Sequence, residues 1–101
     1  MGVLKVFISQ PMIDKTDEQI LNERKRAINI IKKEYGKDVE ILDSFFKGAP
    51  HEATPIWFLG KSIEILSKAN LAYFIGEWRK YRGCKIENLI AHEYGMDTIE
   101  E

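Results

Sequence analysis

The chain has 101 residues, of which 45% are hydrophobic and 31% are charged. These proportions exclude a disordered or fibrous chain, and the length suits one hydrophobic core. The formal net charge of −1 gives no global reason to expect a nucleic acid polymer or an anionic membrane as partner. We therefore expect a single domain over residues 1–101. Such small α/β domains are often stabilised by homo-oligomerisation, so a dimer or higher oligomer is expected.

Cysteine use and hydropathy bear on the compartment. Cys84 is the single cysteine, which excludes an internal disulfide framework and fits a reducing environment. The first residues lack the apolar stretch of a signal peptide, and no run approaches the roughly 18–20 apolar residues of a membrane span. These features predict a cytoplasmic protein.

Short apolar runs alternate with helical patterns along the chain. Thr16 and Gln19 form a capping-box pattern at a helix start, and Gly36 and Gly95 follow the ends of two helical stretches. In chain order we expect a strand over 3–8, a helix over 16–35, a strand over 39–42, a helix over 56–68, a strand over 70–75, a helix over 83–94 and a short last strand over 96–99.

This order of elements predicts the fold class. Strands joined by helices require right-handed crossovers and a parallel sheet, and the nearly continuous apolar runs 3–8 and 71–75 suit strands buried on both faces. The prediction is a doubly wound, Rossmann-like α/β domain of flavodoxin type, with about four strands, helices on both faces and the first strand in the interior. Ligands of such sheets bind outside the carboxyl ends of the strands, which here lead into the loops 9–15, 43–55 and 76–82.

The loop before the last helix is rich in cations. Between Glu77 and Lys85 it holds four basic residues against one carboxylate, and it precedes a helix N-terminus that favours anions. We expect Arg79, Arg82 and Gly83 to form an anion site. The alternative is a solvated loop with scattered basic residues.

Glu87 is the leading candidate for catalysis. Helical spacing directs Ile86, Leu89 and Ile90 toward the sheet, which leaves Glu87 on a neighbouring face near the start of the helix, where the dipole favours its ionised form. A carboxylate in a small pocket is able to attack the anomeric carbon of a sugar. The alternative is a glutamate that merely stabilises its own helix.

Two residues of the long middle loop are further candidates. Asp43 follows a strand and would supply a second acid, or it caps a turn. Phe45 would stack on a nucleobase, or it makes core or dimer contacts. His51 and His92 show no metal-ligand spacing, and no phosphate-binding glycine motif is present, so we expect neither a metal nor a cofactor.

Three segments resemble the nucleoside 2-deoxyribosyltransferase-like family. They are the stretch 82–87 with Ala91 and Gly95, the opening strand and loop over 6–12, and the helix-strand segment 62–74. Together they cover most of the chain, and the likeness is nearest to a small bacterial and phage branch. The resemblance implies that Glu87 attacks the anomeric carbon of a nucleoside and forms a covalent glycosyl intermediate. Phe7 stands where other members have a tyrosine, and Ser62 or Lys61 where they have an assisting aspartate.

The resemblance and the loop cations favour a nucleoside, a nucleotide or an ADP-ribose-like molecule as ligand. One hypothesis is an enzyme that cleaves or transfers an N-glycosidic bond, with Glu87 and Asp43 as catalytic residues. A second is a non-catalytic binder that sequesters a signalling nucleotide, ADP-ribose-like or cyclic, and a third is an interaction domain. The residues expected to bind the ligand are Ser9, Gln10, Pro11, Met12, Phe45, Trp78, Arg79, Arg82, Gly83 and Cys84.

Overall fold

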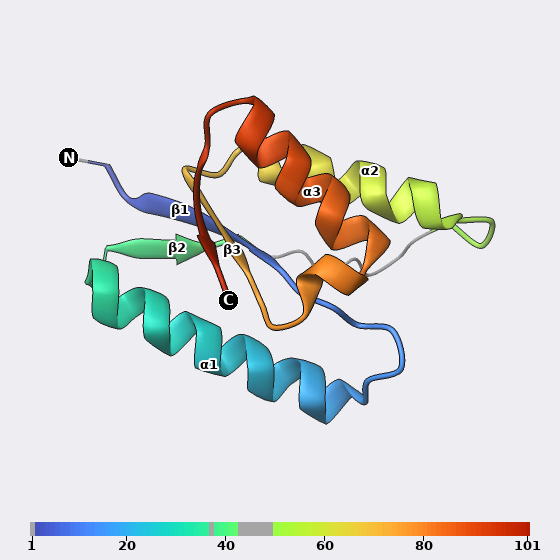
Figure 1. Cartoon of the computed structure of the whole chain (residues 1–101), viewed down its shortest axis with the longest axis horizontal. Coiled ribbons are helices and arrows are strands. Elements are labelled where there is room, and N and C mark those ends of the chain that lie inside the picture. The colour runs from blue at the N-terminus through green and yellow to red at the C-terminus, as the bar shows by residue number, and fades with distance from the viewer. Residues whose placement is uncertain (1, 37, 43–49) are drawn as a thin grey trace.

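The computed structural model describes residues 2–36, 38–42 and 50–101. These residues form four strands, three α-helices and one 3₁₀ turn (Figure 1). In chain order they are β1 (Leu4–Ser9), α1 (Asp17–Tyr35), β2 (Val39–Ile41), α2 (Pro55–Leu66), β3 (Leu71–Phe74), η1 (Trp78–Lys80), α3 (Arg82–Glu93) and β4 (Asp97–Glu100).

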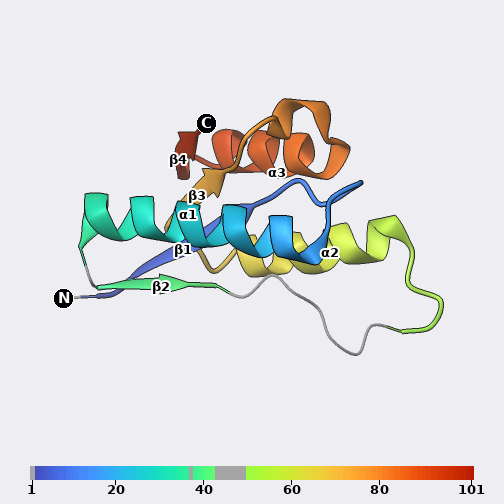
Figure 2. The same cartoon turned by 90° about the horizontal axis from the view of Figure 1, so that it is seen from below.

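The four strands form one parallel sheet in the order β2-β1-β3-β4. The predicted parallel α/β fold is therefore confirmed, and β1 lies in the interior of the sheet as expected. Figure 2 shows β2 and β4 at opposite edges of the sheet. None of the helices in the described ranges has the length and apolar character that crossing a membrane requires.

The start of α1 shows how local sequence sets an element boundary. The Gln19 amide N–H donates to Thr16 Oγ1 at 3.1 Å, and the Thr16 N–H donates to Gln19 Oε1 at 2.9 Å. This capping box satisfies two N–H groups that the helix itself leaves unpaired. At the other end Gly36 has a φ of +85°, a backbone conformation that favours glycine.

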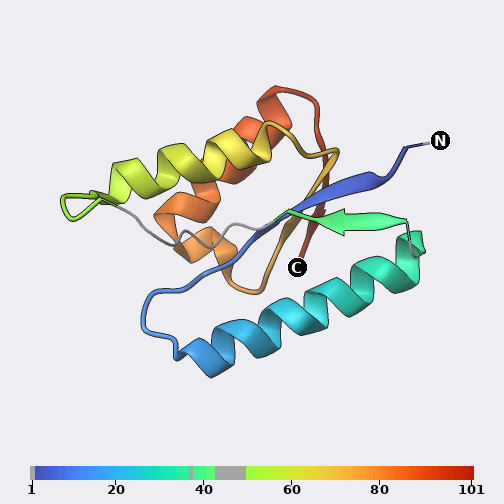
Figure 3. The ribbon, with the colours of Figure 1, turned by 180° about the vertical axis from the view of Figure 1, so that it is seen from behind.

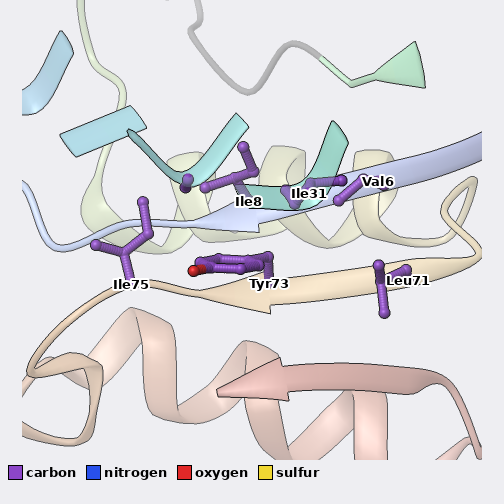
Figure 4. Packing of buried hydrophobic residues seen from close by; sticks show 7 residues of the cluster. Val6, Ile8, Ile31, Leu71, Tyr73 and Ile75 are labelled. Atoms are coloured by element: carbon purple, nitrogen blue, oxygen red, sulfur yellow. The ribbon is translucent and has the colours of Figure 1, made fainter. Parts of the chain in front are cut away.

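Side chains that alternate along the inner strands enter two separate clusters. Val6 and Ile8 of β1 pack with Ala27 and Ile31 of α1, as do Leu71 and Tyr73 of β3 (Figure 4). Phe7, Ala72 and Phe74 instead join a cluster with Leu66 of α2 and with Cys84 and Ala91 of α3. In Figures 1 and 3, α1 accordingly lies on one side of the sheet, while α2 and α3 lie on the other.

The strand order places a topological switch point between β1 and β3. The chain leaves β1 through α1 toward β2, whereas it leaves β3 through α3 toward β4 on the other side. Ser9 and Phe74 are register partners at the carboxyl ends of these strands, and the Ile75 N–H donates to the Ser9 carbonyl at 3.0 Å. Diverging connections leave a crevice at such a point, where α/β proteins of this topology bind their ligands.

Candidate functional site

Glu87 lies on the inward face of α3, not on the neighbouring face that helical spacing predicts. It shares a buried stripe with Cys84 and Ala91, and the residue is only 7% exposed. Leu89, predicted to face the sheet, is 58% exposed. The predicted orientation of α3 is therefore wrong for Glu87 and Leu89, whereas Ile90 packs against the core as predicted. A hydrogen-bonding partner for Glu87 on β1 allows the carboxyl group to take an inward position.

That partner is Ser9, the last residue of β1. Its hydroxyl donates to Glu87 Oε1 at 2.6 Å, and Ser9 itself is 1% exposed. Ser62 of α2 lies close enough to the Glu87 carboxyl group to lower its pKa. Side chains from β1, α2 and α3 thus meet at the carboxyl end of β1, beside the switch point.

Burial sets the protonation of Glu87. Loss of solvent raises the pKa of the carboxyl group from 4.5 to about 7, although the hydrogen bonds from Ser9 and Ser62 partly lower it. Near neutral pH both the protonated and the ionised form of the group are therefore populated. The expected stabilisation of the anion by the helix N-terminus is outweighed, because Glu87 lies in the second turn and the dipole effect fades beyond the first.

Cys84 lies one turn before Glu87 and lines the same buried region. Burial raises the pKa of its thiol to about 11; a hydrogen bond with Ser9 lowers it in part, and the charge of Glu87 raises it further. The thiol is therefore protonated near neutral pH, and it is a poor nucleophile in that form. Its place beside Ser9 and Glu87 is that of a small wall residue.

The end of β1 and the loop that follows it direct their side chains to both faces of the sheet. Ser9 contributes its hydroxyl to Glu87, whereas the Gln10 side-chain amide donates to the Ile20 carbonyl of α1. Pro11 is buried, and Met12 is 38% exposed. Of these four expected ligand-binding residues, Ser9 is thus the one in hydrogen-bond contact with Glu87.

The basic loop places its cations in separate directions. The Arg79 guanidinium stacks over the Trp78 ring at 4.3 Å and lies 3.4 Å from Glu100 of β4, while Lys80 pairs with Glu77 at 3.0 Å. Arg82 is exposed and has no ion-pair partner among the described residues. Trp78 is 5% exposed and packs against Phe74.

The N-terminus of α3 has features that suit an anion. Among the described residues, no side chain caps the first N–H groups of the helix, and none has an atom within 4 Å of a Cβ placed on Gly83. Gly83 itself thus adds no side chain that would cover these N–H groups. Of the two arginines expected at the anion site, Arg79 is paired with Glu100 at the end of β4. Arg82, the first residue of α3, is therefore the arginine that could bind an anion at this helix N-terminus.

The remaining candidates do not add to this site. Asp43 and Phe45 fall outside the described residues. Within the described ranges, no three His, Cys, Asp or Glu side chains are grouped so that they could hold a metal ion. A shallow hollow on α1 is lined only by residues within 18–28 of that helix, so it involves neither Glu87 nor the ends of β1 and β3.

One cluster was missed by sequence reasoning. At the end of β4, the Glu101 carboxylate accepts hydrogen bonds from Arg26, Tyr73 and the Gly76 N–H. Arg26 and Glu101 are 75 positions apart, and no local pattern connects them.

These observations define a candidate site around Glu87, Ser9, Ser62 and Cys84 at the switch point. The resemblance noted in the sequence remains a prediction about its chemistry. Compared with known proteins, the chain matches no family model, no curated protein and no solved structure.

Proposed function

We propose that this protein binds a nucleoside or nucleotide at the carboxyl edge of its sheet and cleaves or transfers the N-glycosidic bond, with Glu87 as nucleophile. The observation that carries the proposal is the buried Glu87 carboxyl group, hydrogen-bonded by Ser9 at the switch point between β1 and β3. Buried carboxyl groups with a pKa shifted toward neutrality are concentrated at active sites, although structural networks also produce them.

The proposed chemistry needs only this carboxylate and water or a second base. The ionised Glu87 attacks the anomeric carbon, the bond from that carbon to the base nitrogen breaks, and its electron pair leaves with the base, which takes a proton from water. Water or another nucleobase then attacks the same carbon, and the ester to Glu87 breaks to restore the carboxylate. A pKa of about 7 provides a large ionised fraction near neutral pH, while the Ser9 hydrogen bond orients the attacking group.

The test is release of free base from a panel of nucleosides, nucleoside monophosphates and ADP-ribose, followed by chromatography. Glu87→Gln retains the shape of the side chain and an oxygen that accepts from Ser9, but it removes the nucleophile. We expect the rate to fall by several orders of magnitude with binding retained. Glu93→Gln is the matched control, since Glu93 is exposed on the same helix, and its rate should equal that of the unmodified chain.

A covalent adduct separates this mechanism from other routes to base release. Intact-protein mass spectrometry of the reacting chain should show the added sugar, and the Glu87→Gln variant should not. Unchanged base release by Glu87→Gln would exclude the proposed mechanism.

A second candidate function is sequestration of a nucleotide without turnover. Two departures from the resembled family favour it. Phe7 replaces a tyrosine and has no hydroxyl, and Ser62 or Lys61 replaces an assisting aspartate. In this case Glu87 donates a hydrogen bond to a ribose hydroxyl when it is protonated and accepts one from a ribose hydroxyl when it is ionised. Binding by calorimetry with no base released from any compound of the panel would select this function, and Glu87→Gln would then alter affinity alone.

A further inference from the structure

The face of the sheet opposite Glu87 carries a cluster of donors around one carboxylate. Arg26 Nη1 and Nη2 lie 2.8 and 2.9 Å from the two oxygens of Glu101. The Tyr73 hydroxyl donates to Oε2 at 2.6 Å, and the Gly76 N–H donates to Oε1 at 2.8 Å. Each oxygen therefore accepts two hydrogen bonds.

The donors come from elements that the fold holds in place. Arg26 belongs to α1, Tyr73 to β3 and Gly76 to the turn directly after β3. Tyr73 is 2% exposed and packs in the α1 cluster, and Figure 4 shows its hydroxyl directed toward the Ile75 end of the strand. Gly76 has a φ of +57°, a conformation that other residues rarely adopt. Tyr73 and Gly76 are thus held by the sheet and its turn, while Arg26 reaches them from α1; together these three donors form what we call the cradle.

The chemistry of the cradle is that of an oxyanion receptor. A planar guanidinium that binds two oxygens at once, a hydroxyl and a main-chain N–H are donors that recognise carboxylate and phosphate groups alike. Burial raises the pKa of the Glu101 carboxyl group, but the hydrogen bonds from Arg26, Tyr73 and Gly76 outweigh it and hold the pKa below 4.5. The surroundings therefore favour negative charge.

We propose that Arg26, Tyr73 and the Gly76 N–H form a phosphate-binding site in which the carboxylate of Glu101 is an intramolecular, displaceable occupant. The Glu101 main-chain N–H donates to the Phe74 carbonyl at 3.0 Å, so displacement requires only that the side chain rotate away while the main chain stays paired with β3. Arg79 Nη1 lies 3.4 Å from the Glu101 main-chain oxygen, while Nη2 of the same guanidinium lies 3.4 Å from the Glu100 carboxylate. A phosphate dianion offers more charge and more acceptor oxygens than the carboxylate that it replaces.

This proposal does not depend on glycosidic chemistry at Glu87. It requires only that a phosphate group compete with Glu101 for the same donors. The competing explanation is that Glu101 simply fastens β4 to α1 and β3, with no ligand involved.

Inorganic phosphate is the probe that distinguishes a phosphate-binding site from a purely structural role of Glu101. In Glu101→Gln the internal competitor loses its charge, so phosphate should bind about tenfold more tightly than to the unmodified chain, as expected when most of a site is self-occupied. Phosphate should also raise the Tm of this variant more than chloride does at equal ionic strength. Adding Arg26→Gln should abolish both effects. Glu93→Gln is the matched control, because Glu93 is exposed on α3 and is not one of the groups bonded to Arg26, Tyr73 or Gly76, so phosphate affinity should not change.

A measurement on the unmodified chain keeps the proposal testable if the variants fold poorly. Phosphate, but not chloride, should shift the backbone amide resonance of Gly76. The absence of both this shift and phosphate binding by Glu101→Gln would overturn the proposal and leave Glu101 as a fastening for β4.

Discussion

Glu87 and Glu101 are two glutamates near the same edge of the sheet, on opposite faces, and their surroundings treat the negative charge in opposite ways. Glu87 is buried beside the Ser9 hydroxyl, with no cation paired to it among the described residues, and its pKa is raised to about 7. Glu101 is bound by an arginine, a tyrosine and a main-chain N–H, and its pKa is lowered. The same side chain is thus destabilised as an anion at one place and stabilised at the other.

The comparison indicates different roles for the two carboxylates. A carboxylate that stabilises a fold is normally paired with a cation or accepts several N–H bonds, as Glu101 does. A carboxylate buried without a cation weakens the fold when it ionises, so its retention needs another explanation. Glu87 is of this second kind, which is why we assign chemistry to it.

The largest expected effect is a pH-dependent gain of stability in Glu87→Gln. The pKa of Glu87 is about 7 in the folded protein and 4.5 in the unfolded chain. Between pH 4.5 and 7 the folded protein therefore binds more protons than the unfolded chain does, and its stability falls as the pH rises through this range. The free energy of unfolding of the variant, relative to the unmodified chain, should increase by about 3 kcal/mol between these limits.

Urea unfolding of both proteins across this pH range measures the difference directly. Because all other titrating groups are shared, subtraction isolates Glu87. Glu93→Gln, on the exposed side of α3, should show a flat difference over the same range. A flat difference for Glu87→Gln would mean that the carboxyl group is not desolvated in the folded protein.

A smaller effect is expected from Ser9→Ala. The Ser9 hydroxyl donates to a buried carboxyl group at 2.6 Å, and a hydrogen bond to a charged group contributes about 1.5–3 kcal/mol. We expect a loss of about 2 kcal/mol above neutral pH and a smaller loss at acidic pH, where Glu87 is neutral. The pKa of Glu87, followed by carboxyl carbon NMR, should rise further. A loss independent of pH would show that Ser9 contributes through packing.

The fold could be predicted from the sequence because its signals are local. The capping box at Thr16 and the apolar run of β1 are each readable within a few residues, and the strand-helix alternation then fixes a parallel sheet. The positions of α3 and of the short strand β4 that follows it were also predictable from local sequence patterns.

The candidate site was predictable only in part, because its contacts are distant in sequence. Ser9 and Glu87 are 78 positions apart, so no local pattern indicates their contact. Apolar periodicity alone predicts that Leu89 faces the sheet, whereas in the structure Glu87 does. The basic loop shows the same limit. Its local composition predicts a shared anion site, but Arg79 is directed to Glu100, which no local pattern indicates.

The smallest effect that we expect comes from Tyr73→Phe at the other carboxylate. The substitution removes one of four hydrogen bonds to Glu101 and leaves Arg26 and Gly76 in place, so about 1 kcal/mol should be lost near neutral pH. Because the folded pKa of Glu101 lies below 4.5, this contribution is present above that pH and disappears as pH falls through the folded pKa. Tyr73→Phe therefore lowers stability where Glu87→Gln raises it. Acid removes both effects, but over different ranges: between about 7 and 4.5 for Glu87→Gln, where Glu87 becomes protonated, and below 4.5 for Tyr73→Phe, where Glu101 does. Urea unfolding of Tyr73→Phe over the acidic range tests this contrast. A loss that persists at low pH would assign the Tyr73 hydroxyl a partner other than the Glu101 carboxylate.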